Sequence, residues 1–379
     1  MLERENYKAL ITNARRIVIK VGTSTLTHCT GKLNLQLIEK LVRQLTDLRY
    51  QDKQVLLVTS GAVGAGMGKL GLQEKPKTMP EKQAAAAVGQ GILMHIYEKL
   101  FSEYGQIVAQ LLLTRPDLAD RRRFLNARNT LLTLLNKEVV PIINENDTVV
   151  VEELRFGDND TLGALVAGLV DADLLILLSD IDGLYTGDPR KDENARLIPV
   201  VEEITTEIQG LAGSEGSKFG SGGMATKISA AKIAINAGIP MVIANGSQPD
   251  ILREILMGTQ LGTLFIPRDV KPHARKNWIA FGSNIQGKLW VDDGARKAIL
   301  TNGKSLLPSG IFKSEGIFTS GHVVSIVDSE GVEFARGIVN YNAQELEKIK
   351  GIQCKEIVNI LGYKDYDEVI HRDNLAVRI

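Results

Sequence analysis

The sequence predicts an α/β protein with a large domain, built on a mostly parallel sheet covered by helices, and a smaller β-rich domain after it. Apolar runs of strand length alternate with helical patterns from about residue 16 to about residue 266, as in parallel sheets whose strands are joined by helices. The pattern then changes, because residues 267–276 are polar with two prolines and short segments divided by Gly and Asn follow. A chain of 379 residues is long enough for both parts.

The first half of the large domain begins with a predicted strand at residues 16–21, an apolar run that ends in the turn Gly-Thr-Ser. Apolar residues at the 3.6-residue period predict a helix over residues 33–48. The apolar run at 54–59 predicts a second buried strand, which opens into a glycine-rich segment. An alanine-rich helix at 83–101 and a strand at 107–113 complete this half.

The second half continues the alternation. We expect helices over residues 126–135, 159–170, 224–237 and 251–257, and strands over residues 139–143, 172–178 and 241–244. In the smaller domain we expect strands at residues 288–291, 316–318, 323–327 and 334–339, and a helix at 342–349.

Four polar clusters are expected to meet at the carboxyl edge of the sheet. The first, at residues 179–186, directly follows the apolar strand at 172–178, which has the composition of a strand buried on both faces. The other clusters lie at 144–147, 157–160 and 220–227. Ligands of open α/β sheets bind in the crevice outside the carboxyl ends of the strands. We therefore place the functional site at this edge.

Residues 220–227, Gly-Ser-Gly-Gly-Met-Ala-Thr-Lys, lead directly into a predicted helix and have the character of a phosphate-binding loop. Glycines at a helix N-terminus let backbone N–H groups approach an anion, and the helix dipole favours negative charge there. Lys227 would then reach the outer phosphates. A flexible loop that merely precedes the helix is the alternative. No Walker A spacing occurs, and the GxGxxG match at 66–71 lies too far beyond its strand for a dinucleotide fold.

Lys20 lies near the end of the first strand, where an ammonium group in an apolar run is costly unless it meets an anion. We expect a phosphate or carboxylate partner, and a lysine that reaches solvent from the strand end is the alternative. The clusters at 144–147 and 157–160 supply carboxylates and amides that could orient lysines or hold a substrate, or be ordinary turn residues. The histidines show no metal or triad spacing; they are His28, His95, His273, His322 and His371.

The composition argues against several classes of protein. The 45 basic and 45 acidic side chains give a net charge of zero, so the whole chain has no basic footprint for nucleic acid or anionic lipid. Cys29 and Cys354 lie far apart without ligand-spaced neighbours, which disfavours disulfides or zinc and indicates a reducing cytosol. The N-terminal residues lack the apolar segment of a secretory signal. Asp171 and Asp173 interrupt the most apolar stretch, so we expect no membrane span and a cytoplasmic location.

Several motifs, in a fixed order, resemble those of the glutamate 5-kinases, and the resemblance extends over essentially the full chain. The motifs are Val-Ile-Lys-Val-Gly-Thr-Ser at 18–24, Val-Thr-Ser-Gly-Ala at 58–62, Val-Pro-Ile-Ile-Asn-Glu-Asn-Asp at 140–147, Phe-Gly-Asp-Asn-Asp at 156–160, Asp-Gly-Leu-Tyr-Thr at 182–186, Asp-Pro-Arg at 188–190, and residues 220–227. Together they are far more specific than any one of them.

The resemblance implies the amino acid kinase fold, an α/β/α sandwich, followed by the C-terminal PUA domain that longer bacterial members carry. The segments that resemble this domain are residues 306–310, 321–324 and 335–338. The implied division is an amino acid kinase domain at 14–266, a linker at 267–284, a PUA domain at 285–363 and a C-terminal tail at 364–379.

The resemblance further implies ATP-dependent phosphorylation of the side-chain carboxylate of L-glutamate to L-glutamyl 5-phosphate, the first step of proline biosynthesis, with Mg²⁺ bound mainly through the phosphates. A carboxylate nucleophile is already ionised at pH 7, so positioning and charge neutralisation suffice without a general base. Members of the family are commonly homo-oligomers, dimers or tetramers, are inhibited by proline, and act together with glutamyl phosphate reductase. The loop at 114–124 is a candidate for regulation or subunit contact, and a solvated charged segment is the alternative.

The motif positions imply the roles of individual residues. Lys20 and Lys227 would stabilise the transferring phosphoryl group, and Asp160 would orient them. Glutamate would be held by Ser60, Asp147 and Asn159. ATP would be contacted by Lys20, Ser179, Asp180, Ser221, Gly222, Gly223, Met224, Ala225, Thr226 and Lys227. No residue is assigned as a direct metal ligand. Ser179 and Ser221 stand where many members of the family have Thr, and both keep the hydroxyl.

Two other functions stay open. The acceptor could be N-acetylglutamate, aspartate, carbamate or a nucleoside monophosphate, although the PUA-like segment and the clusters at 144–147 and 157–160 favour glutamate. The C-terminal domain could instead bind RNA. Residues 275–379 hold 14 basic and 13 acidic side chains, so this domain lacks the basic excess on which nonspecific RNA affinity depends.

Overall fold

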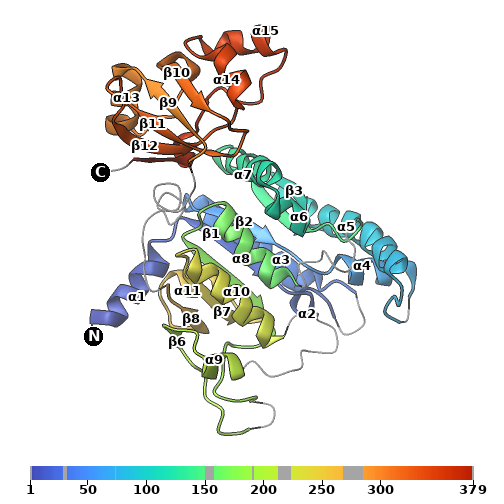
Figure 1. Cartoon of the computed structure of the whole chain (residues 1–379). Helices are drawn as coiled ribbons and strands as arrows, with labels where there is room; N and C mark the ends of the chain where they lie inside the picture. Colours follow the sequence, from blue (N-terminus) through green and yellow to red (C-terminus); the bar gives the residue numbers. More distant parts are fainter. Residues whose placement is uncertain are drawn as a thin grey trace. The chain divides into compact units, whose positions relative to one another are not determined.

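A computed structural model of the chain shows two compact units, Met1–Val270 and Lys271–Ile379 (Figure 1). The residues that it describes are 2–28, 32–72, 74–149, 158–189, 192–211, 223–267 and 285–377. Each unit has its own sheet and its own buried apolar core. Within these ranges, the helices are all too short or too polar to cross a membrane.

The first unit is built on an eight-stranded sheet with the order β3-β4-β2-β1-β5-β7-β8-β6. The strands are β1 (Arg16–Val21), β2 (Gln54–Val58), β3 (Val108–Leu113), β4 (Val140–Glu145), β5 (Leu174–Ser179), β6 (Val200–Val201), β7 (Met241–Asn245) and β8 (Thr263–Phe265). All pairings are parallel except that of β7 with β8, so the mostly parallel sheet that the sequence predicts is confirmed.

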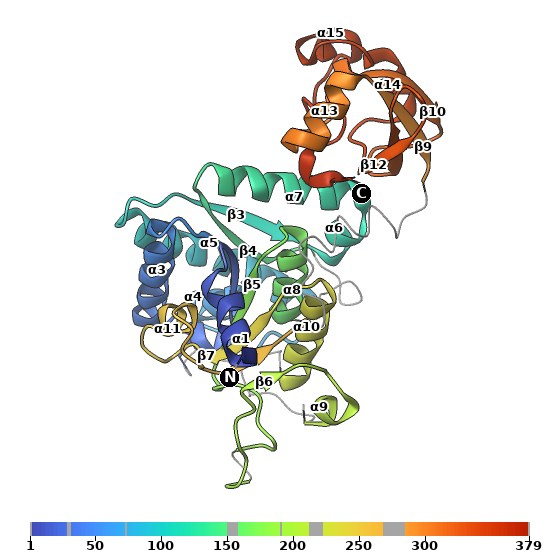
Figure 2. The ribbon, with the colours of Figure 1, turned by 90° about the vertical axis from the view of Figure 1, so that its left-hand side faces the viewer.

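Helices cover both faces of this sheet, which makes the unit an α/β/α sandwich. The helices are α1 (Leu2–Thr12), α2 (Thr23–Leu26), α3 (Leu35–Tyr50), α4 (Ala62–Leu70), α5 (Met79–Ser102), α6 (Arg115–Ala119), α7 (Arg121–Asn136), α8 (Asn159–Leu169), α9 (Thr206–Gly210), α10 (Met224–Asn236) and α11 (Ile251–Leu256). Successive strand residues enter opposite cores: Ile17 and Ile19 pack with α3, α5 and α11, whereas Val18 packs with α7, α8 and α10. Figure 2 shows α3 and α8 on opposite sides of the sheet.

Helices α4 and α5 approach each other so closely that only glycine fits at two contact points. A Cβ at Gly66 would lie 1.8 Å from the carbonyl oxygen of Ala85, and a Cβ at Gly89 would lie 1.7 Å from that of Ala62. The GxGxxG match at 66–71 therefore belongs to a helix, where its first glycine serves packing. This helix was not expected from the sequence, because glycine has poor helix propensity.

The second unit is built on a five-stranded sheet with the order β10-β9-β11-β12-β13. Its strands are β9 (Gly287–Val291), β10 (Ile311–Gly316), β11 (Val323–Val327), β12 (Glu333–Ile338) and β13 (Leu375–Val377), and its α-helices are α13 (Asp293–Asn302), α14 (Ala343–Ile349) and α15 (Ile357–Leu361). The strand that we expected at 316–318 is wrong. Strand β10 ends at Gly316, whose positive φ of 106° turns the chain, so that Ile317 is exposed and Phe318 enters the core.

Both ends of the chain extend beyond the implied domain limits. Helix α1 lies ahead of residue 14 and places Ile11 in the core of the first unit. Strand β13 lies in the segment 364–379 and pairs with β12. Most of the linker at 267–284 falls outside the described residues.

Candidate active site

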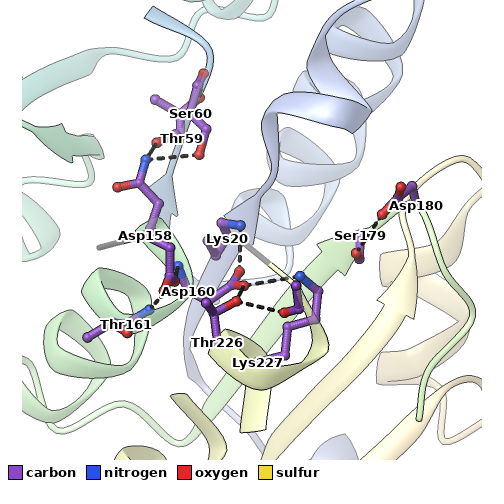
Figure 3. A network of polar contacts seen from close by, with 12 residues as sticks. Lys20, Thr59, Ser60, Asp158, Asp160, Thr161, Ser179, Asp180, Thr226 and Lys227 are labelled. Atoms are coloured by element: carbon purple, nitrogen blue, oxygen red, sulfur yellow. Dashed lines mark hydrogen bonds and ion pairs between the residues drawn. The ribbon is translucent and has the colours of Figure 1, made fainter. Parts of the chain in front are cut away.

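The carboxyl ends of the central strands form one edge of the first sheet, and the candidate residues gather there (Figure 3). Lys20 of β1 pairs in register with Val58 of β2 on one side and with Leu177 of β5 on the other. Ser60 follows β2 and Ser179 ends β5, so these hydroxyls and the Lys20 side chain lie at neighbouring strand ends. Parallel packing thus brings together residues that are distant in the sequence.

Lys20, Asp160 and Lys227 form a buried triad at this edge. One carboxylate oxygen of Asp160, Oδ1, accepts from Lys20 Nζ at 2.5 Å, and the other, Oδ2, accepts from Lys227 Nζ at 3.1 Å. The three side chains are only 8%, 1% and 7% exposed. The alternative of a lysine that reaches solvent is therefore wrong for Lys20. Because two ammonium groups face one carboxylate, one positive charge within the triad is left uncompensated.

The N-terminus of helix α8 delivers Asp160 to the triad. Asp158 caps this helix, since its Oδ1 accepts from the backbone N–H groups of Asp160 and Thr161 at 2.7 and 2.9 Å. Gly163, one turn further, leaves room for the stem of Lys20: a Cβ at this position would lie 3.3 Å from Lys20 Cβ. The sequence Asp-Asn-Asp at 158–160 thus caps the helix and aims two side chains into the site.

The two carboxylates of this segment have opposite pKa shifts. Burial by itself raises the pKa of Asp160, but the positive charges of Lys20 and Lys227 outweigh this effect and hold the pKa at about 2. Burial, together with the negative charge of Asp160, raises the pKa of Asp158. Asp160 therefore stays ionised and keeps both lysines oriented.

A cluster of amides and hydroxyls lies beside the triad. Asn159 Nδ2 lies 2.7 Å from the carbonyl oxygen of Thr59, 2.9 Å from Ser60 Oγ and 2.9 Å from Asn144 Oδ1. Asn144 was part of a predicted cluster but was given no role, and the structure adds it to the site. Asp147 is half-buried in the turn that follows β4. Whether it contacts glutamate stays a prediction.

The N-terminus of helix α10 borders the triad on its other side. Gly223 caps the helix without a side chain, and Met224 and Ala225 form its first turn with Thr226. Thr226 Oγ1 lies 3.0 Å from Asp160 Oδ2 and 2.7 Å from the carbonyl oxygen of Gly223, and so joins the loop to the triad. Ser221 and Gly222, which were also predicted to contact ATP, lie outside the described residues.

The residues after β5 line the same edge. Ser179 is buried and its hydroxyl lies 3.1 Å from Asp180 Oδ1, while Asp180 is exposed. Asp182 joins the loop after β5 to the end of β7, because its carboxylate accepts from Asn245 Nδ2 at 3.0 Å and from the Tyr185 hydroxyl of its own loop at 3.0 Å. These contacts fix the loop that carries Ser179 and Asp180.

This arrangement suits the transfer of an anionic group between two bound anions. The triad offers a buried positive charge, the N-terminus of α10 offers backbone N–H groups, and the amides of Asn144 and Asn159 offer polar contacts for a second molecule. Such a site works by positioning and by neutralising charge.

Family models and known proteins match this chain over most of its length. The model of the Amino acid kinase family matches residues 15–245, and the model of the PUA domain matches residues 287–361. Glutamate 5-kinase from Moorella thermoacetica is 61% identical over 377 residues, which cover 100% of both chains. Glutamate 5-kinase from Caldanaerobacter subterraneus subsp. tengcongensis is 59% identical over 96% of this chain and 97% of its own. The solved structure of UMP kinase from Bacillus anthracis aligns with a TM-score of 0.48 and 16% identity, over 68% of this chain and 97% of that one.

Proposed function

The chain belongs to the amino acid kinase family and, within it, to the glutamate 5-kinases, and from this premise we propose that its site transfers the γ-phosphoryl group of ATP to the side-chain carboxylate of L-glutamate. The product is L-glutamyl 5-phosphate, an acyl phosphate. A PUA domain follows the kinase domain.

The observation that carries this proposal is the uncompensated positive charge of the buried triad. In the transition state, the transferring phosphoryl group spreads negative charge over its three equatorial oxygens, and the attacking and leaving oxygens are negative as well. Lys20 and Lys227 are held by Asp160 at a separation set by its two oxygens, so both ammonium groups can face the same phosphoryl group. The positions of the lysines are fixed before substrate arrives, which is the condition for strong electrostatic stabilisation.

Glutamate is proposed to lie over the amide cluster. Its attacking carboxylate is ionised at neutral pH, so no residue has to remove a proton. Ser60, Asn159 and Asp147 keep their predicted roles in binding the substrate, and the contact between Asn144 and Asn159 adds Asn144 to this group.

ATP is proposed to bind between the loop after β5 and the N-terminus of α10. Ser179 and Asp180 would contact it from one side, and residues 221–227 from the other. Gly223 caps α10 without a side-chain hydrogen bond, and the backbone N–H groups of the first turn would bind the phosphates. Lys20 and Lys227 lie between this region and the amide cluster.

Mg²⁺ is proposed to arrive with ATP. It prefers oxygen ligands and is often held by the phosphates and only one or two carboxylates. Across the part of the chain that the structure describes, no group of three or more His, Cys, Asp or Glu side chains could hold a metal ion. We propose that the metal is held mainly by the phosphates, where it would neutralise charge on the leaving oxygens.

Regulation and partners are proposed from the family. Proline, which has the five carbons and the α-carboxylate of glutamate but no side-chain carboxylate, would compete at the amide cluster. We further propose a homo-oligomer, a dimer or a tetramer, in the cytoplasm, and delivery of the unstable acyl phosphate to glutamyl phosphate reductase. The segment at 114–124, a candidate for regulation or subunit contact, was expected to be a loop, but it forms α6 and the start of α7. An ion pair of 2.8 Å joins Arg123 to Asp117 within it.

The test is ADP formation from Mg-ATP with L-glutamate, N-acetylglutamate, aspartate, carbamate or UMP as the acceptor, each with and without L-proline. We expect turnover only when glutamate is the acceptor, and we expect proline to suppress this turnover. Turnover with another acceptor would keep the phosphoryl transfer chemistry but overturn the assignment of Ser60, Asp147 and Asn159. Glutamate turnover that proline leaves unchanged would refute the proposed regulation only.

A further inference from the structure

Gln90 lies in the middle of helix α5 and is buried beside the amide cluster, although it belongs to none of the motifs that identified the site. Gln90 is 7% exposed, and its Oε1 accepts a hydrogen bond from Asn144 Nδ2 at 2.9 Å. Its Nε2 is buried with no hydrogen-bond partner among the described residues. An unpaired buried donor destabilises a fold. A buried glutamine with an unpaired amide nitrogen therefore calls for a functional reason.

The orientation of the amides in this cluster follows from one backbone group. The backbone N–H of Glu145 donates to a side-chain atom of Asn144 at 2.9 Å. Since an N–H group cannot accept, that atom is the oxygen, Oδ1, and the nitrogen of Asn144 faces Gln90. The atom of Gln90 that meets this nitrogen must then be Oε1. The contact is thus a hydrogen bond that runs from Asn144 to Gln90.

Asn159 depends on this orientation. Its Nδ2 has two hydrogens but three oxygen atoms within 2.9 Å, those of Thr59, Ser60 and Asn144. If the amide of Asn144 turned over, a nitrogen would replace its Oδ1 beside Asn159, and Asn159 would shift toward its other two acceptors. The bond to Gln90 therefore acts together with the backbone N–H of Glu145 to hold Asn144 with Oδ1 toward Asn159.

Helix α5 also reaches the other end of the cluster. Tyr97 lies two turns after Gln90 on the same helix and is fully buried. Its hydroxyl lies 2.9 Å from Thr59 Oγ1, and the carbonyl oxygen of Thr59 is one of the acceptors for Asn159. Gln90 thus contacts the end of β4, and Tyr97 contacts the chain just beyond β2. Close packing against α4 fixes the helix that carries them.

We propose that Gln90 is a positioning residue for the acceptor substrate, which it serves by holding Asn144 with Oδ1 toward Asn159. The inference rests on the proposed function, because it takes the amide cluster as the site that binds glutamate. Gln90 contacts no member of the triad in the described structure, so its effect falls on substrate binding and leaves the phosphoryl transfer step largely intact.

The first experiment compares Gln90→Met with Gln90→Glu in the full-length protein. Gln90→Met keeps the length of the side chain but accepts no hydrogen bond, so we expect the KM for glutamate to rise about tenfold or more, with kcat and the KM for ATP changed less than about threefold. Gln90→Glu still accepts from Asn144 and should restore most of the KM. An unchanged KM in Gln90→Met, or an equal rise in both variants, would overturn the inference.

A matched control is available on another helix. The Oε1 of Gln44 in α3 accepts from the backbone N–H of Leu252 at 3.0 Å, away from the site. Gln44→Met removes a hydrogen bond of the same kind and should leave the KM for glutamate at the wild-type value. A rise equal to that of Gln90→Met would show that the effect is a general loss of stability and would overturn the inference.

A double-mutant cycle tests whether Gln90 acts through Asn144. Asn144→Ala should raise the KM for glutamate, and adding Gln90→Met to it should raise the KM no further, because the partner is already absent. Multiplied effects would show that Gln90 acts independently and would contradict the proposal.

Tyr97→Phe is a separate test for the case that Gln90→Met fails to fold. Loss of the Tyr97 hydroxyl should also raise the KM for glutamate, and an unchanged KM would count against a positioning role for α5.

The outcomes separate this inference from the proposed function. A wild-type protein without glutamate-dependent ADP formation would refute the proposed function. A wild-type protein that turns over glutamate, together with a fully active Gln90→Met, would refute only the role of Gln90.

Discussion

At the scale of single residues, the chemistry depends on two lysines that one carboxylate holds in place. The side chain of Lys227 is 7% exposed, and its distance to Asp160 is 3.1 Å. Because Asp160 also pairs with Lys20, removal of one lysine leaves the carboxylate with a partner. The effect of such a change on activity can therefore be separated from its effect on stability.

We predict that Lys227→Ala reduces kcat by about 10²-fold to 10³-fold or more while the protein stays folded, since a preorganised positive charge is lost from the transition state. The measurement is steady-state turnover with glutamate and Mg-ATP, with circular dichroism to verify the fold. Lys232→Ala, on the same helix but bonded to Gln209 at the periphery, is the control and should keep wild-type turnover. Near-normal turnover of Lys227→Ala would remove this residue from the mechanism.

Asp160 also predicts how stability depends on pH. Its pKa is about 2 in the folded state and near 3.8 in the unfolded chain. Between these values the unfolded state binds the proton more readily, so the contribution of Asp160 is complete above about pH 4 and is lost as the pH falls toward 2. From the difference between the two pKa values we expect this loss to be about 2 kcal/mol.

The measurement is denaturant unfolding of the wild type and of Asp160→Asn between pH 5 and pH 2.5. The wild type should lose more free energy of unfolding over this range than the variant. Asp158 acts with the opposite sign, because its raised pKa favours the protonated folded state as the pH falls. This opposing effect is smaller in Asp160→Asn, because the negative charge of Asp160 is one cause of the raised pKa of Asp158. Parallel pH profiles for the two proteins would contradict the pairing of Asp160 with the lysines.

The residues of the triad could be predicted from the sequence because each lies in a compact motif at a strand or helix end. Gln90 could not, because it lies in an alanine-rich helix and its partner, Asn144, is 54 positions away. The role of an amide such as Gln90 is set by the tertiary contact alone. No local pattern distinguishes it from a solvent-exposed glutamine on any other helix.

At the scale of elements, the buried strands were the easiest to predict, since β1, β2 and β5 are apolar runs bounded by polar turns. Strands β6 and β8, with two and three residues, are too short to show any periodicity. Helix α4 was missed for a different reason. Its sequence, Ala-Val-Gly-Ala-Gly-Met-Gly-Lys-Leu, has weak intrinsic helix propensity, and contact with α5 stabilises it.

The contact between α4 and α5 gives a prediction with an internal control. A Cβ at Gly89 would overlap the backbone of α4, whereas at Gly91, on the same helix, no atom lies within 4 Å. We expect Gly89→Ala to destabilise the protein by about 3 kcal/mol, because two backbones must separate. Gly91→Ala should stabilise it by up to about 1 kcal/mol, the difference in helix propensity between the two residues.

Denaturant unfolding of both variants measures these effects, and the KM for glutamate shows whether α5 has moved. Since Gln90 follows Gly89 directly, a shift of the helix in Gly89→Ala should also raise this KM. If Gly89→Ala were as stable as Gly91→Ala, the two helices would not be in backbone contact.

At the scale of the whole molecule, every candidate residue of the site lies in the first unit, Met1–Val270. The two cores of this unit are formed by residues up to Ile266, and the core of the second unit begins at Leu289. In the sequence, a change of pattern near residue 267 indicates a boundary close to the division between the two units. The sequence does not predict what the second unit does, because the charges of this unit are balanced and its motifs contain no catalytic cluster.

We therefore predict that a fragment of residues 1–270 folds by itself and phosphorylates glutamate with a kcat within a few-fold of the full chain. Each unit has its own buried core, so we expect the first unit to keep its fold without residues 271–379. Turnover of the fragment and of the full chain, measured side by side with far-ultraviolet circular dichroism and melting curves, tests this. A folded fragment without turnover would mean that the second unit takes part in the reaction, whereas a change confined to inhibition by proline would assign that unit to regulation.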